Sequence, residues 1–155
     1  MLLTYLLIFV KIKCKLGANM NEDYRELDNL IHMYASELSM LSDIETKIHK
    51  TKNKENLDIL YHYEKYHFEK SSEYLKDIKT SLKNYKYDNL IIHLNQKRKD
   101  WTEASKNDEY LIKNPVIWGL DDAYYHAIAY VEISRITKNQ HTKNSTKHFP
   151  KNKTL

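Results

Sequence analysis

The scarcity of glycine and proline constrains this chain more than any other feature of its sequence. Only two of each occur in 155 residues. These residues supply most tight turns, so the sequence leaves little room for many short strands joined by turns. Apolar residues recur at spacings of three and four, and 30% of the residues are charged. We therefore predict an all-α protein, a bundle of about four helices whose first two are long and antiparallel.

Residues 1–19 are the most apolar part of the chain, and their role is doubtful. Their uninterrupted apolar run is about half of the roughly 20 residues that span a bilayer. No basic region precedes it, as a signal peptide would require. Leu16 to Met20 can be encoded with the ribosome-binding sequence AGGAG shortly before an ATG. We expect translation to begin at Met20, and a membrane or targeting segment is the alternative.

The charges are unevenly distributed. All 21 acidic residues lie between Glu22 and Glu132, and 17 of the 25 Lys and Arg residues lie within residues 20–136. The predicted domain, residues 20–136, is therefore mildly acidic and does not suggest a broad nucleic-acid face. Residues 137–155 have no periodicity and predict a disordered basic tail. This tail offers salt-sensitive contact with nucleic acid through Lys138, Lys143, Lys147, Lys151 and Lys153.

Two long helices are predicted first, over residues 22–50 and 54–85, with a polar break at residues 51–53. Asn21 or Asp23 is the expected cap of the first helix. Each helix has an apolar seam that alternates steps of four and three. In the first helix the seam is Leu27, Ile31, Tyr34, Leu38, Leu41 and Ile48. In the second it is Leu57, Tyr61, Phe68, Leu75, Ile78 and Leu82, with Glu64 and Ser71 as polar members.

Two further helices are predicted, over residues 88–105 and from Asp121 or Asp122 to Ile136. Residues 106–119 are expected to connect them, with Gly119 free to take a positive φ. The last helix is apolar nearly all round, which indicates a buried or interfacial position.

Tyrosines are the candidate partner contacts, because they suit surfaces with one apolar and one wet end. Beside its apolar seam, the helix predicted over residues 54–85 carries a second stripe, formed by Tyr63, Tyr66 and Tyr74. Two stripes suggest that this helix contacts two neighbouring elements. The candidate interface residues are Tyr63, Tyr66, Tyr74, Tyr124 and Tyr125.

Glu64 and His67 form an E-x-x-H pair, the spacing with which one helix of a di-iron bundle binds metal. A di-iron site needs a second such pair, which the sequence lacks. Asp122 and His126 share a face but do not complete the set. We therefore expect no metal or cofactor, and we interpret Glu64, His67 and His126 as ordinary structural residues.

Arg135 and His141 are separated by five residues, which is similar to the R-x(4–6)-H motif of HEPN-type helical ribonucleases. This resemblance would imply an RNA-cleaving helical protein with these two residues in its site. The sequence departs from the family pattern, because Ile136 stands where a polar residue usually follows the Arg. His141 also lies in the predicted tail.

A short basic cluster, Lys97, Arg98 and Lys99, is followed at once by Asp100. We interpret it as a solvated helix face, and nucleic-acid contact is the alternative. No glycine-rich phosphate loop or hydrolase motif is present.

We therefore expect a small non-enzymatic interaction protein of the regulator or inhibitor type, which binds another protein. The single cysteine, Cys14, and the Lys-, Asn-, Ile- and Tyr-rich composition fit the cytoplasm of a low-GC bacterium or a phage or plasmid it carries. Two alternatives stay open: a nucleic-acid-binding accessory protein that uses the basic tail, and a metal-dependent or HEPN-like enzyme. A homodimer is compatible with all three.

Overall fold

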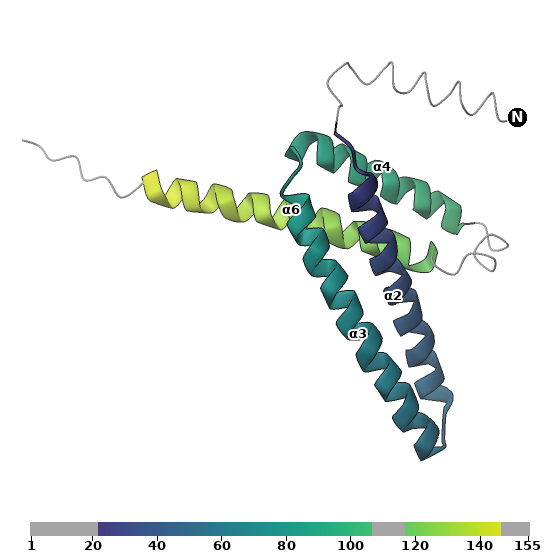
Figure 1. Cartoon of the computed structure of the whole chain (residues 1–155). Coiled ribbons are helices and arrows are strands. Elements are labelled where there is room, and N and C mark those ends of the chain that lie inside the picture. The colour runs from purple at the N-terminus through teal and green to yellow at the C-terminus, as the bar shows by residue number, and fades with distance from the viewer. Residues whose placement is uncertain (1–21, 107–116, 147–155) are drawn as a thin grey trace, which may run out of the picture.

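The structure, a computed structural model, describes residues 22–106 and 117–146. It contains four helices in these ranges and no strand: α2 (Arg25–Lys50), α3 (Lys54–Leu82), α4 (Tyr87–Ser105) and α6 (Ile117–Thr146). The predicted all-α bundle of about four helices is confirmed (Figure 1). The expectations for residues 1–19 and 147–155 lie outside the described residues.

Helices α2 and α3 form a long antiparallel hairpin (Figure 1). The predicted break at residues 51–53 is confirmed, and Asn53 caps α3 by accepting a hydrogen bond from the Asn56 N–H at 3.2 Å. Helix α2 begins at Arg25, three residues later than predicted, with Tyr24 at the N-cap position. Asp23 nevertheless accepts the Arg25 N–H at 3.0 Å, so it satisfies one free donor of the first turn.

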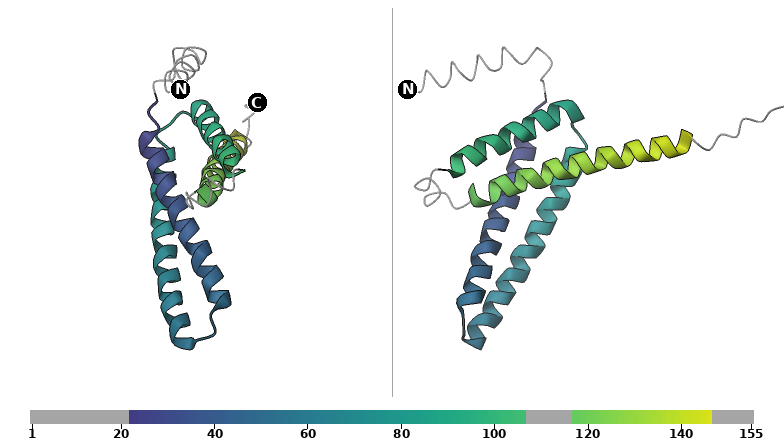
Figure 2. Two further views of the ribbon diagram at one scale, coloured as in Figure 1. Left: turned by 90° about the vertical axis from the view of Figure 1, so that its right-hand side faces the viewer. Right: turned by 180° about the vertical axis from the view of Figure 1, so that it is seen from behind.

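Helices α4 and α6 lie across one end of the hairpin, on one of its sides (Figure 2). The hydrophobic core fills this crossing. Helix α2 contributes Leu27, Ile31, Tyr34 and Ala35, and α3 contributes Ile78 and Leu82. The other two helices contribute Leu90, Leu94, Leu120, Ala123, Tyr124, Ala127 and Val131. The distal half of the hairpin, residues 40–70, extends beyond this core (Figure 1). Ile44 is its one buried side chain.

The start predicted for the last helix is wrong, because α6 already begins at Ile117. Gly119 lies inside the helix and has no positive φ. A Cβ at this position would overlap the carbonyl oxygen of Ala35 in α2. Glycine is therefore needed for the close approach of two helix backbones. Asp121 is not a cap and instead accepts hydrogen bonds from Arg98 Nε at 3.1 Å and Thr102 Oγ1 at 2.7 Å, which join α4 to α6.

The predicted start of the disordered tail at residue 137 is also wrong, because α6 continues to Thr146. The added segment contains neither Gly nor Pro, and the helix extends from a packed N-terminal half, which removes the cost of nucleation. The segment extends beyond the body of the protein and carries Lys138 and Lys143 on its exposed surface (Figure 2). None of the described helices has the length and apolarity needed to cross a membrane.

The predicted seam of α3 is correct except at two members. Leu57, Glu64, Ser71, Leu75, Ile78 and Leu82 are at least partly buried, as expected. In the distal half, Leu60 and His67 are the partly buried residues between them. Tyr61 and Phe68, which were expected inside, are exposed.

Candidate functional site

One side of the hairpin carries a row of apolar side chains that no described element covers. Ile59, Tyr63 and Tyr66 are 50%, 56% and 53% exposed and follow one another by steps of four and three along α3. At about 100° per residue they lie about 140–160° around α3 from Lys79, whose Nζ is 5.3 Å from the Tyr130 ring centroid of α6. The row therefore faces away from α6.

Helix α2 adds to the same side of the hairpin. Met33 and Met40 are seven residues apart and about half exposed. They lie about 140–160° around α2 from Ala35, the residue whose carbonyl approaches Gly119 of α6. Both helices thus turn exposed apolar side chains away from α4 and α6. We call this surface the outer face, formed by Met33, Met40, Ile59, Tyr63 and Tyr66.

The outer face exists because polar side chains occupy the inside of the hairpin at this level. His67 Nδ1 lies 2.5 Å from Glu37 Oε2 of α2, and both side chains are largely buried. The hydroxyl of Ser71, one turn further along, donates to the Phe68 carbonyl at 2.8 Å. With Glu64, His67 and Ser71 turned inward, the aromatic residues of the same turns are left outside. This arrangement reverses the usual amphipathic pattern of a helix.

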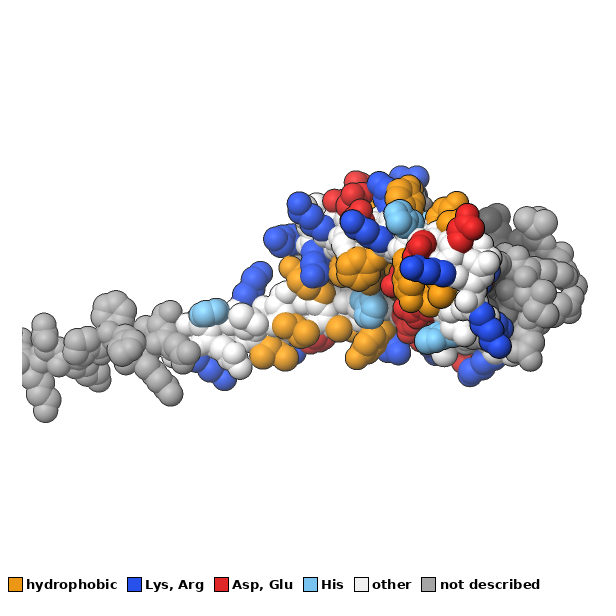
Figure 3. All heavy atoms as spheres, turned by 90° about the horizontal axis from the view of Figure 1, so that it is seen from below, with side chains coloured by type: hydrophobic (Ala, Val, Ile, Leu, Met, Phe, Trp, Pro, Cys, Tyr) orange, Lys and Arg blue, Asp and Glu red, His pale blue; other side chains and the backbone are white. Residues whose placement is uncertain are grey.

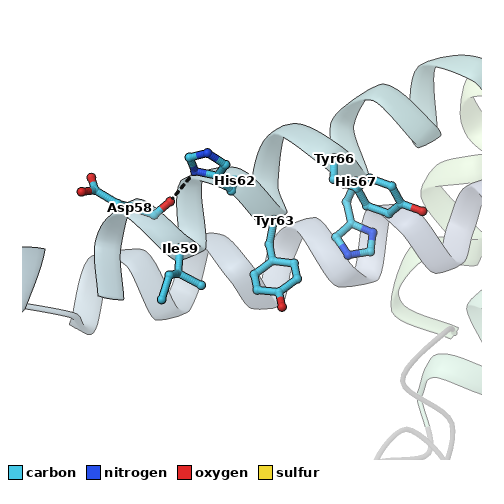
Figure 4. A pocket seen from close by; sticks show the side chains of 6 residues that line it. All are labelled: Asp58, Ile59, His62, Tyr63, Tyr66 and His67. Carbon is cyan, nitrogen blue, oxygen red and sulfur yellow. Dashed lines mark hydrogen bonds between the residues drawn. The ribbon is translucent and has the colours of Figure 1, made fainter. Parts of the chain in front are cut away.

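A shallow hollow of about 640 Å³ lies on the outer face. Its lining comes from two turns of α3: Asp58, Ile59, His62, Tyr63, Tyr66 and His67. Figure 4 shows Ile59 and Tyr63 pointing to the same side of the helix, while Asp58 and His62 point to another. Figure 3 shows orange hydrophobic side chains open to solvent among charged ones, on the body and on the extending part of α6. An aromatic surface with a hollow and a charged rim is the usual composition of a protein contact site.

The other three predicted interface tyrosines lie elsewhere. Tyr74 is half-buried and packs against the core. Tyr124 is fully buried in the core, so its prediction as an interface residue is wrong. The aromatic ring of Tyr125 is half exposed but lies under the Arg98 guanidinium, 4.8 Å from it.

A polar cluster joins α2, α4 and α6 around Asp28. Its carboxylate accepts from Tyr124 OH at 2.7 Å and lies 2.9 Å from His93 Nε2. Burial acts to raise the pKa of Asp28, but the bonds from His93 and Tyr124 outweigh it and lower the pKa. Burial and the nearby carboxylate raise the pKa of Tyr124. Asp28 therefore stays charged and Tyr124 stays protonated at neutral pH, which maintains the connection between the helices.

The E-x-x-H pair, Glu64 and His67, does not form a metal site in the structure. His67 pairs with Glu37 rather than Glu64. His126 Nδ1 shares a hydrogen bond of 2.9 Å with Tyr34 OH. No group of three His, Cys, Asp or Glu side chains suited to a metal ion occurs among the described residues.

The basic cluster on α4 is largely engaged within the fold. Lys97 Nζ is 3.9 Å from Asp28 Oδ2, and Arg98 Nε is 3.1 Å from Asp121 Oδ1. Lys99 is exposed. On α6, Lys138 and Lys143 are exposed on a helix. Lys147, Lys151 and Lys153 lie outside the described residues.

The two residues of the HEPN-like spacing do not point toward each other within this chain. Arg135 lies over the Tyr87 ring at 4.7 Å and is 3.7 Å from Glu132 Oε2. His141 lies six residues along the same helix, which places it about 9 Å further along the axis and about 120° around it.

Comparison with protein-family models, with curated proteins and with solved structures finds no match to this chain. Its function is therefore inferred from its own residues.

Three residues of the outer face are absent from the sequence prediction, namely Met33, Met40 and Ile59, and so are Asp58 and His62, which line its hollow. A signal for Ile59 was present, because it precedes Tyr63 and Tyr66 in the same heptad pattern. The methionines carry no such signal, since their exposure depends on where α6 crosses α2. The role of Asp28 and His93 depends on contacts between residues 65 apart in the sequence.

Proposed function

We propose that this protein is a non-enzymatic helical interaction module of the kind used by regulators and inhibitors. Its contact surface is the outer face of the α2–α3 hairpin. The observation that carries the proposal is the row Ile59, Tyr63 and Tyr66, at least half exposed and away from α4 and α6.

The chemistry of the outer face suits a helical protein partner. Apolar anchors at steps of four and three match the way in which one helix packs against another. Tyrosine and methionine are favoured at such contacts, tyrosine for its large amphipathic ring and methionine for its adaptable shape. Charged side chains along the rim, among them Glu55 and Lys70, provide orientation.

The proposal is tested by site-specific photo-crosslinking of the full chain. The photoreactive residue p-benzoylphenylalanine replaces either Tyr63 or Tyr61. These tyrosines are 56% and 52% exposed on the same helix, but about 160° apart around it. We expect a protein adduct from position 63 in host extract and little from position 61. Equal labelling at both positions, or no adduct at either, would contradict the proposal.

A second candidate function, nucleic-acid binding, has one observation in its favour. A hollow of about 580 Å³ between α3, α4 and α6 combines aromatic and cationic side chains. It includes Tyr85, Tyr87, Lys83, Arg135 and Lys138. Aromatic rings with nearby cations are the elements of single-strand binding. Fluorescence anisotropy with a labelled dT20 oligonucleotide tests this candidate. The double variant K83E/K138E should abolish binding. An affinity that does not change with salt concentration would contradict this candidate function.

A further inference from the structure

We propose that the partner of the outer face is a second copy of this chain, bound antiparallel through α3 to form a symmetric four-helix assembly of two hairpins. This inference rests on the proposed function, because it names the occupant of the same surface. It is carried by the order of side chains along the exposed row of α3.

The exposed row is self-complementary when read in opposite directions. From one end to the other it contains Glu55, Ile59, Tyr63, Tyr66 and the partly exposed Lys70, whose Nζ also lies 3.0 Å from Glu73 Oε2 of the same helix. The acid and the base lie at the two ends, and the apolar side chains lie between them. Steps of four and three keep all five on one side of the helix.

A twofold axis between His62 and Tyr63 brings unlike groups together. It places Glu55 opposite Lys70 of the partner copy, and Ile59 opposite Tyr66, because each pair is equally far from the axis. The row from residue 55 to residue 70 is about 22 Å long. A parallel arrangement would instead bring Glu55 against Glu55 and Lys70 against Lys70, which costs free energy. The charges therefore favour the antiparallel twofold arrangement.

The shape of the surface agrees with this axis. The hollow of about 640 Å³ is centred on His62 and Tyr63, beside the proposed axis, so each copy can receive aromatic side chains of the other. Met33 and Met40 of α2 lie on the same side of the hairpin and would extend the contact to the second helix. Two hairpins packed in this way give each distal half the apolar cover that it lacks within one chain.

The test is the mass of the full chain in solution, measured by sedimentation equilibrium over a range of concentrations. We expect a species of twice 18.6 kDa that dissociates with a Kd on the order of 1–10 µM. Y63E places two carboxylates beside the axis and should weaken the dimer by more than about 100-fold. Y61E is the matched control on the opposite side of α3 and should leave the dimer intact. Circular dichroism confirms that each variant is folded.

The orientation is tested by charge exchange at the two ends of the row. E55K and K70E should each weaken the dimer by about tenfold, because each creates two like-charge contacts. The double variant E55K/K70E restores unlike pairs and should return the Kd close to that of the parent. Single variants that weaken the dimer without rescue in the double variant would overturn the antiparallel register.

A monomer at all concentrations up to about 100 µM would overturn the dimer itself, since that concentration is at least about tenfold above the expected Kd. The crosslink from position 63 separates the two proposals. An adduct of twice the chain mass supports the dimer. An adduct with a different protein overturns it and leaves the proposed function standing, and no adduct contradicts both.

Discussion

At the scale of single residues, Asp28 is the polar group that joins the most helices. Its carboxylate contacts His93 and Tyr124 at hydrogen-bond distance, and Lys97 lies 3.9 Å away. These three partners come from α4 and α6, while Asp28 belongs to α2. One carboxylate thus ties the hairpin to both helices that cross it.

Replacement of Asp28 by Asn should lower the free energy of unfolding by about 2–4 kcal/mol, because it removes the charge that a half-buried network requires. Urea denaturation at pH 7 measures this loss. D23N is the control, since Asp23 is exposed and bonds within its own turn; we expect little change. A D28N variant as stable as the parent would show that the carboxylate is dispensable.

His32 gives the fold a measurable acid sensitivity. Its half-buried ring lies edge-on to Trp101 and Tyr124, and burial lowers its pKa below 6.5, with Asp28 acting in the opposite direction. The unfolded chain therefore binds a proton more readily than the folded one. The stability from neutral His32 is complete above pH 6.5 and is lost as pH falls through the lower folded pKa.

Replacement of His32 by Phe should retain the ring contacts and remove this titration. We expect Tm to fall less steeply between pH 7.5 and 5 in H32F than in the parent. Differential scanning calorimetry at several pH values makes the comparison. Equal slopes for both proteins would exclude His32 as a contributor.

At the scale of helices, the contact between α2 and α6 depends on Gly119. Replacement of Gly119 by Ala should lower stability by about 1–3 kcal/mol, even though Ala favours a helix, because the added methyl group meets backbone that cannot move aside. Thermal unfolding measures the loss. D122A, an exposed change in the same helix, serves as the control. A stabilised G119A variant would mean that the helices separate at no cost.

Element positions were predictable from the sequence where breakers and caps mark them. The break at residues 51–53 is such a case, since Asn53 both interrupts the apolar pattern and caps α3. The start of α6 was not predictable in the same way. Gly119 suggests a turn when read alone, and its actual role depends on a backbone 84 positions earlier in the chain.

The seam of α3 shows why the outer face was predicted only in part. From Leu57 to Ile78 the sequence allows steps of four then three, or three then four, and both include Glu64 and Ser71. Near the core, α6 lies against α3, and Tyr74 and Leu75 both pack against the core, so both choices are partly buried there. In the distal half nothing described covers that side, and Phe68 remains exposed. The position of the neighbouring helices determines which of the two seams is buried, and the sequence of α3 alone does not give that position.

At the scale of the whole molecule, stability should be graded along the hairpin. One end lies in the core formed by all four helices, whereas residues 40–70 contain one buried side chain, Ile44. Regions with few buried apolar contacts open at a lower free energy than the core. The same distal half carries most of the outer face, so the surface proposed for binding lies on the least stable part of the hairpin.

Hydrogen exchange followed by mass spectrometry tests this gradient. In a dilute solution, amides of residues 40–66 should exchange faster than those of residues 27–35 and 74–82, which face the core. Binding at the outer face should slow hydrogen exchange selectively in the distal half. A ligand that binds only the closed state raises the free energy of local opening by its own binding free energy. For the parent chain the slowing should grow with protein concentration, and Y63E should remove it. Uniform protection along the hairpin at every concentration would contradict both the gradient and its coupling to binding.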